Sequence, residues 1–223
     1  MILKSKKLEI VGELAACVAH EIRNPLTSMK GFVHLLENGT VQRDYLEQIH
    51  LACEQIEQYI NELLLLAAPQ QVNKELVNIR LLLEDVIDIV EDKLVQKRIF
   101  FNREYELEDS SHIVCDPTQI SKVIHHILAN SIEAISSTGT ISIDVKNEEG
   151  KVVIKISDNG VGMSKERLAK LGEPYFSTKE KGTGIGFMLC YQIISQHKGT
   201  IMVNSEENVG TIVEVTLPIL VEE

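Results

Sequence analysis

Apolar side chains recur at alternating intervals of three and four residues over a long stretch in the first third of the chain. They occupy positions Leu46, Ile49, Cys53, Ile56, Ile60, Leu63 and Ala67. Such a heptad repeat places one apolar stripe along an α-helix and predicts that the stripe packs against other helices. Residues 8–36 repeat in a similar way, with a slip of phase next to His20 and Pro25.

The segment between these two stretches, residues 37–44, contains a glycine and several turn-forming residues. The two helices should therefore fold back on each other as an antiparallel hairpin, and Pro69 predicts the end of the second helix. Two helices alone cannot bury the apolar stripe. We therefore expect two hairpins to pair as a four-helix-bundle dimer.

From about residue 75 the apolar pattern changes, because half-buried strands alternate with helices. The strand pattern covers 141–147, 151–157 and 211–217, and the helical pattern covers 79–97, 117–135 and 185–197. This order predicts an α+β fold in which helices cover one face of a mixed sheet, as a two-layer sandwich. We place residues 1–72 in the helical hairpin and 73–223 in this second domain.

Charge and composition exclude several classes of protein. The net charge of −11 and the lack of a basic cluster argue against nucleic-acid binding. No apolar run approaches the ~18 residues of a membrane span, so we expect the chain as given to be cytoplasmic. The cysteines, Cys17, Cys53, Cys115 and Cys190, are widely spaced and indicate free thiols in a reducing compartment.

Polar residues interrupt the helical pattern over 117–135 on the face opposite its apolar stripe. They are His126, Asn130 and Glu133, at intervals of four and three. An asparagine oxygen on such a helix could bind Mg²⁺ whose other ligands come from phosphates. A solvated polar face explains the same pattern.

Two glycine-bearing segments lie further along the chain. The sequence "DNGVGM" follows a strand, so Asp158 could accept a hydrogen bond from an exocyclic amine, and Gly160 and Gly162 would let backbone approach a flat ring. Residues 173–187 contain three alternate glycines at a helix start, which favours phosphate binding by backbone N–H groups. Each segment alone could be an ordinary turn.

The order of these elements resembles the Bergerat-type ATP-binding domain shared by gyrase, Hsp90, MutL and the histidine kinases. Together with "HEIRNPLT" on a heptad hairpin, the whole chain resembles a sensor histidine kinase core, and residues 15–36 are most similar to the sporulation kinases of bacilli. The resemblance implies autophosphorylation with ATP and Mg²⁺ and onward transfer to an aspartate of a response regulator.

The resemblance also assigns roles to single residues. His20 would be the phospho-acceptor, Glu21 its acid–base partner, and Asn24 would orient water when the partner's phospho-aspartate is hydrolysed. Asn130 would hold Mg²⁺ and Asp158 would bind the adenine amine. The remaining nucleotide contacts would be Gly160, Gly162, Lys179, Gly182, Gly184, Gly186 and Thr211.

The chain departs from the family pattern at one position. His126 stands where the family usually has an asparagine, four residues before the metal-binding one. The related ATPases have at that position a glutamate that acts as general base for water, so His126 argues against a hydrolase. Pro25 removes a helical hydrogen bond just after His20, and we interpret it as a hinge.

Two other functions compete with the kinase. An ATPase clamp would hydrolyse ATP without a stable phosphoprotein, and a docking module would only dimerise or relay phosphate. Among partners we expect a second copy of the chain, a response regulator, and a small inhibitory protein that competes for the hairpin. Kinases of this family normally carry a sensor ahead of the hairpin, so we also expect a longer parent that can be anchored in a membrane.

Overall fold

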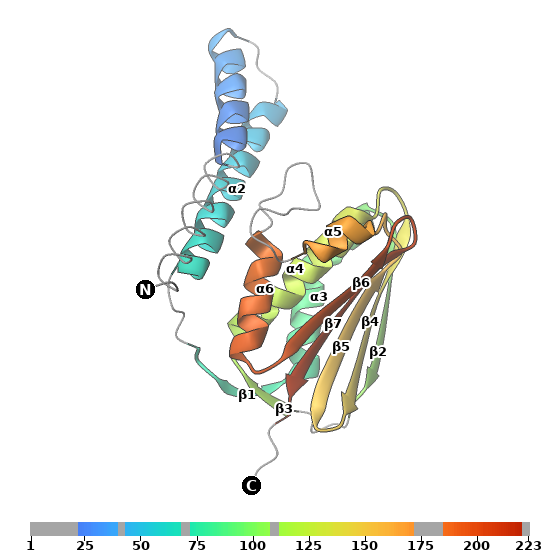
Figure 1. Cartoon of the computed structure of the whole chain (residues 1–223). Helices are drawn as coiled ribbons and strands as arrows, with labels where there is room; N and C mark the ends of the chain where they lie inside the picture. The colour runs from blue at the N-terminus through green and yellow to red at the C-terminus, as the bar shows by residue number, and fades with distance from the viewer. Residues whose placement is uncertain (1–21, 40–42, 68–71, 108–111, 172–184, 220–223) are drawn as a thin grey trace. The chain divides into compact units, whose positions relative to one another are not determined.

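A computed structural model describes residues 22–39, 43–67, 72–107, 112–171 and 185–219 (Figure 1). The chain divides into two compact units. One contains the two helices of the hairpin. The other begins at Gln71 and contains the sheet with the helices that cover it.

The hairpin unit consists of a helix described over residues 22–37 and of α2 (Arg43–Ala67). Its helices are antiparallel, because Phe32 stacks on Tyr45 with ring centroids 5.4 Å apart, whereas the earlier Met29 meets the later Cys53. Gly39, with φ +80°, closes the first helix as predicted.

Much of the predicted apolar stripe is exposed in the single chain. Leu46 is 65% exposed, Ile60 is 42% exposed, and Val33 on the other helix is 42% exposed. Burial of such side chains stabilises by roughly 1.5–3 kcal/mol each. A single hairpin therefore leaves apolar surface that a second helical pair would cover.

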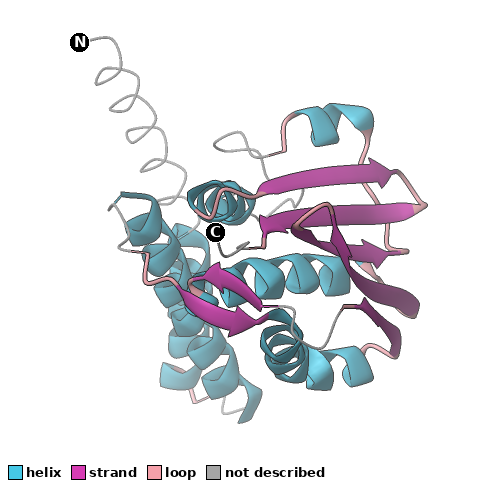
Figure 2. Ribbon diagram, turned by 90° about the horizontal axis from the view of Figure 1, so that it is seen from below, coloured by secondary structure: helices cyan, strands magenta, loops and turns pink. Residues whose placement is uncertain are grey.

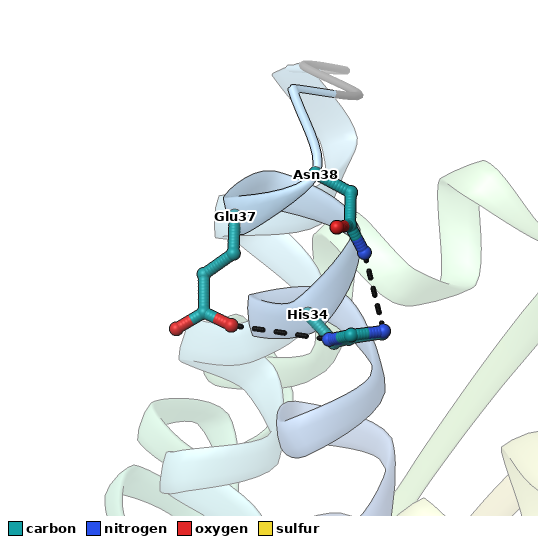
Figure 3. A network of polar contacts seen from close by, with 3 residues as sticks. All are labelled: His34, Glu37 and Asn38. Carbon is teal, nitrogen blue, oxygen red and sulfur yellow. Dashed lines mark hydrogen bonds and ion pairs between the residues drawn. The ribbon is translucent and has the colours of Figure 1, made fainter.

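His34 is an exposed histidine of the hairpin with a carboxylate beside it. His34 lies between Glu37 and Asn38 near the end of the first helix (Figure 3). Its Nδ1 is 3.9 Å from the Glu37 carboxylate, and its Nε2 is 3.1 Å from the side-chain nitrogen of Asn38. The side chain is 75% exposed.

The second unit contains a two-stranded sheet and a five-stranded sheet. The smaller pairs β1 (Glu75–Asn78) with β3 (His112–Cys115), antiparallel. The larger has the order β2-β4-β5-β7-β6, formed by Ile99–Glu106, Gly139–Glu148, Lys151–Asp158, Gly210–Pro218 and Thr200–Glu206. Strands β2 and β4 are parallel and the other pairs antiparallel, so the predicted mixed sheet is confirmed.

Three helices cover one face of the larger sheet, as expected for two layers (Figure 1; Figure 2 shows the same layers from below). They are α3 (Ile79–Gln96), α4 (Pro117–Ala134) and α6 (Ile185–Gln196). A short helix, α5 (Lys165–Ala169), follows the loop after β5. Alternate residues of β4 and β5, such as Ile143 and Ile154, form the core with the inner helix faces.

Helix α4 is fixed at its N-terminus by hydrogen bonds to the segment before the sheet and to α6. The buried Asp116 carboxylate accepts from the backbone N–H of Gln119 and from that of Asn73, both at 3.0 Å. The backbone N–H of Asp116 donates to Nε2 of the buried His197, whose Nδ1 donates to the Ile193 carbonyl. This N-cap therefore connects three separate parts of the chain.

The C-terminus of α4 is fixed by a residue from the end of α3. Nζ of Lys97 donates to the carbonyls of Ile132 and Ile135, at 2.8 and 3.0 Å. The last turn of a helix leaves carbonyls without an intrahelical partner, and a cation there also interacts favourably with the helix dipole. Both ends of α4 are thus held by other elements.

We expect Asp116→Ala, at the N-cap of α4, to destabilise the sheet unit more than removal of the N-cap residue of α3 does. The variant loses the N-cap bond and the bond to Asn73, and should lower the opening free energy of α4 by about 2 kcal/mol. Hydrogen exchange of the peptide covering α4, in the full chain, measures this. Asn78→Ala, at the half-buried N-cap of α3 whose capping bond is solvent-exposed, is the control and should cost about 1 kcal/mol or less. Equal losses would show that the additional contacts of Asp116 contribute nothing.

Candidate functional site

The candidate site begins at the end of β5, where the carboxylate of Asp158 accepts three hydrogen bonds. Ser131 Oγ, from α4, donates to Oδ2 at 2.8 Å. The backbone N–H of Gly160 donates to Oδ1 at 3.0 Å, and the backbone N–H of Thr211 also donates to the carboxylate. One helix, one loop and the neighbouring strand β7 therefore fix this side chain.

Burial raises the pKa of Asp158, and the three donors oppose that shift. Removal from water disfavours the charged carboxylate, whereas each N–H or O–H donor stabilises it. An ionised carboxylate is a hydrogen-bond acceptor only. The side chain of Asp158 is therefore suited to accept a hydrogen bond from an amine at a partly buried site.

The loop after Asp158 is fastened to three neighbouring elements. Asn159 accepts at Oδ1 from the backbone N–H of Thr140, at 2.8 Å. The backbone N–H of Val161 donates to the Ala134 carbonyl at 3.0 Å, and the Val161 carbonyl accepts from the N–H of Asn208 at 2.7 Å. The loop therefore has one defined conformation.

Gly160 and Gly162 make room for the protein's own backbone. A Cβ atom on Gly160 would lie 2.7 Å from the carbonyl oxygen and Cβ of Ala134. Gly162 has φ +62°, and a Cβ there would lie 1.9 Å from the carbonyl oxygen of Glu206. A side chain at either position would therefore meet α4 or the end of β6.

Thr211 is half-buried and lies directly opposite Asp158 in the register of β5 and β7. Its hydroxyl is 2.9 Å from Ser205 Oγ, which also donates to the carbonyl of Gly210 and accepts from the backbone N–H of Met163. The structure thus brings Asp158, the two glycines of the loop and Thr211 close together.

The polar stripe of α4 is only partly exposed. Glu133 is exposed, but His126 and Asn130 are half-buried. At His126, α6 contributes to this burial, since the ring of Phe187 packs edge-on against His126 with centroids 6.4 Å apart, and Tyr191 packs edge-on against Phe187 at 5.7 Å. Neither His126 nor Asn130 is therefore part of a fully solvated face.

Asn130 offers the ligand type that a hard cation prefers, an amide oxygen. It is the residue before Ser131, and so lies one position from the side chain that bonds Asp158. The described residues include no group of three or more acidic, histidine or cysteine side chains placed to hold a metal.

Several predicted site residues lie outside the described residues, namely His20, Glu21, Lys179, Gly182 and Gly184. Asn24 is described and exposed, and Pro25 beside it is buried. Near Pro25 two hydroxyls donate back along the helix, Thr27 to the Arg23 carbonyl and Ser28 to the Asn24 carbonyl. Gly186 is buried in the first turn of α6.

Sequence reasoning missed Ser131, although the sequence contained a signal for it. Ser131 falls four residues after Ile127 and seven after Ile124, on the buried stripe of α4. A hydroxyl at a core position needs a hydrogen-bond partner. That requirement could have indicated a polar neighbour, though not which one.

Two protein families match this chain. Residues 10–72 match the His Kinase A (phospho-acceptor) domain, and residues 115–221 match the histidine kinase-, DNA gyrase B- and HSP90-like ATPase. The chain belongs to the histidine kinases. The resemblance and the fold class predicted from the sequence are confirmed, and the ATPase domain implies that the nucleotide of this kinase core is ATP.

Among curated proteins, the kinase core is 40% identical to sporulation kinase E of Bacillus subtilis (strain 168), over 97% of this chain and 30% of that protein. It is 38% identical to sporulation kinase A of the same organism, over 98% of this chain and 36% of that protein. The chain thus spans about a third of the length of these relatives.

Among solved structures, histidine kinase ThkA in complex with the response regulator protein TrrA is similar, with a TM-score of 0.82. The identity is 28%, over 97% of this chain and 64% of that one. In the part of the chain that the structure describes, none of the helices is both long and apolar enough to cross a bilayer.

We expect Gly162→Ala to disrupt the loop, because the added Cβ meets the Glu206 carbonyl at a position of positive φ. The variant should lose about 3 kcal/mol or more of unfolding free energy. Gly150→Ala is a matched control, since Gly150 has φ +75° and open space around a Cβ, and should lose about 1 kcal/mol. Urea unfolding followed by circular dichroism compares them. Similar losses would mean that the close approach does not constrain the loop.

We expect Asp158→Asn to weaken ATP binding without weakening the fold. Because burial raises the pKa of Asp158 in the folded chain, folding favours the protonated form. Ionisation therefore costs stability progressively as the pH rises from the usual carboxyl pKa through the raised one. The variant should melt no lower than wild type at pH 7, and its advantage should shrink toward pH 4.

Thermal melts of both proteins across this pH range, with ATP titrations at pH 7, measure the two effects. The amide presents a donor where the amine needs an acceptor, so ATP affinity should fall by about tenfold or more. A wild type whose stability relative to the variant increases with pH would contradict the assigned direction.

Proposed function

We propose that this core is an ATP-dependent autophosphorylating histidine kinase of a phosphorelay, in which 1–72 is the phospho-acceptor and dimerisation domain and 73–223 is the catalytic domain. The observation that carries the proposal is the Asp158 site, an amine-accepting carboxylate beside the Asn130 helix, in a chain that also has a phospho-acceptor domain. The relatives support a role in sporulation control.

Nucleotide binding would divide among the elements of the sheet unit. Asp158 would accept a hydrogen bond from the 6-amino group of adenine. Thr211 would face the base, and Gly160 and Gly162 would shape the pocket wall. Asn130 would hold Mg²⁺, which when bound neutralises phosphate charge. Lys179 would contact phosphate together with the backbone of the glycine-rich segment, at Gly182, Gly184 and Gly186.

The chemical step would occur on the imidazole of His20. Glu21 would accept a hydrogen bond from the N–H of one ring nitrogen. The lone pair of the other ring nitrogen is then free to attack the γ-phosphorus. A nitrogen–phosphorus bond forms as the bond from phosphorus to the β,γ-bridging oxygen breaks, ADP leaves, and Glu21 receives the ring proton. The phosphoryl group would then pass to an aspartate carboxylate of a response regulator.

His126 favours transfer of the γ-phosphoryl group to the kinase itself over hydrolysis of ATP. The clamp ATPases of the superfamily require a base that activates water, and here the corresponding side chain is an imidazole packed edge-on against Phe187. The phosphoprotein would therefore be the product of the reaction. Asn24, exposed on the hairpin, would orient water when the phospho-aspartate of the partner is hydrolysed.

The hairpin would form the homodimer and bind the partners. The phospho-acceptor family supports dimerisation, and exposed side chains such as Leu46 and Ile60 give a second copy apolar surface to cover. Pro25 would act as a hinge between forms that admit the catalytic domain and the response regulator, and a small inhibitory protein on the hairpin would block both. The free thiols of the described residues fit the cytoplasm.

Incubation with γ-labelled ATP and Mg²⁺ should give a protein label that is lost in acid, is stable in alkali, and disappears in His20→Ala. His34→Ala is the matched control, because His34 is an exposed imidazole of the described hairpin beside a glutamate, and its label should equal that of wild type. A wild type that binds ATP without taking up label would overturn the kinase activity, and measurement of released phosphate would then separate an ATPase from a docking module.

A further inference from the structure

Ser131 is a buried polar residue that neither the family pattern nor the proposed chemistry uses. It lies on α4 and is 4% exposed, among Ile127, Leu128 and Ile132. Its hydroxyl donates to Oδ2 of Asp158 at 2.8 Å. A buried hydroxyl without a partner costs about 1–3 kcal/mol, so this bond satisfies Ser131 as well as the carboxylate.

The contribution of Ser131 to Asp158 differs in kind from those of the other two donors. Gly160 and Thr211 donate through backbone N–H groups, which every residue except proline has. The third donor depends on the side chain at position 131. It alone connects the carboxylate to α4, the helix that also carries Asn130.

Orientation of the carboxylate determines which lone pair faces a ligand. The bond from Ser131 engages Oδ2 and the bond from Gly160 engages Oδ1, so the plane of the carboxylate is fixed by one donor on each oxygen. Without the hydroxyl, rotation about the last side-chain bond of Asp158 is less restricted, because that torsion is intrinsically broad. The remaining lone pairs would then be less well aimed.

We propose that Ser131 is a positioning residue for purine recognition, which acts through Asp158 by orienting its carboxylate toward the 6-amino group of the base. The inference rests on the proposed nucleotide site and extends it to a specificity-determining residue. Ser131 sets how strongly the site prefers a 6-amino purine over a purine without that group.

The test compares two nucleotides on the full chain, by calorimetric titration in the presence of Mg²⁺. The nucleotides are ATP and purine riboside triphosphate, which lacks the 6-amino group. Ser131→Ala should weaken ATP binding by about five- to tenfold, the effect of one ordinary hydrogen bond. The same substitution should change binding of the amine-free nucleotide by less than about twofold.

Two further variants control for effects on the helix and on hydroxyl chemistry. Ser121→Ala makes the same change on the same helix, at a half-buried position, and should leave both affinities unchanged. Ser131→Thr retains the hydroxyl and should restore discrimination between the two nucleotides. If Ser131→Ala does not fold, Ser131→Cys, with a weaker donor of similar shape, should show the same amine-dependent loss.

Each outcome of this experiment decides the inference. Equal weakening of both nucleotides by Ser131→Ala would make Ser131 a structural residue only, and unchanged ATP binding would also overturn the proposal. A wild type that binds the two nucleotides equally would overturn the role of Asp158 itself. That last result differs from the others because it appears before any substitution, so failure of the site and failure of the inference are distinguishable.

Discussion

The position of α4 is the constraint on which the proposed nucleotide site depends. Asp116 and His197 fix its first turn, and the Lys97 ammonium group fixes its last carbonyls. Between these ends the helix carries Asn130 and places Ser131 against the end of β5. Because its ends are held by α3, α6 and the segment after the hairpin, displacement of α4 would break several hydrogen bonds at once.

The placement of α4 also determines how the loop after Asp158 and the β6–β7 turn are held. The apolar stripe of α4 packs into the core with the inner faces of β4 and β5, and its C-terminal carbonyl at Ala134 accepts from Val161 in the loop after Asp158. The loop then reaches the β6–β7 turn through Asn208. Helix, loop and turn therefore form one continuous wall, rather than three independent elements.

The sequence predicted the architecture well, and the details of the site less well. The periods of the helices and of β4, β5 and β7 are clear because each has one buried face. Strands β2 and β6 were missed because both lie at sheet edges, where alternation is interrupted by exposed apolar residues such as Phe100 and Met202. Partners distant in sequence, such as Ser131 with Asp158, depend on the tertiary fold and could not be read from local patterns.

The packing of the glycines has a consequence for the energetics of binding. Since the backbone around Gly160 and Gly162 is held against Ala134 and Glu206 in the absence of a nucleotide, this side of the proposed site is already formed before a ligand arrives. A wall that is ordered beforehand loses little conformational entropy on association, so its ordering cost on binding would be small.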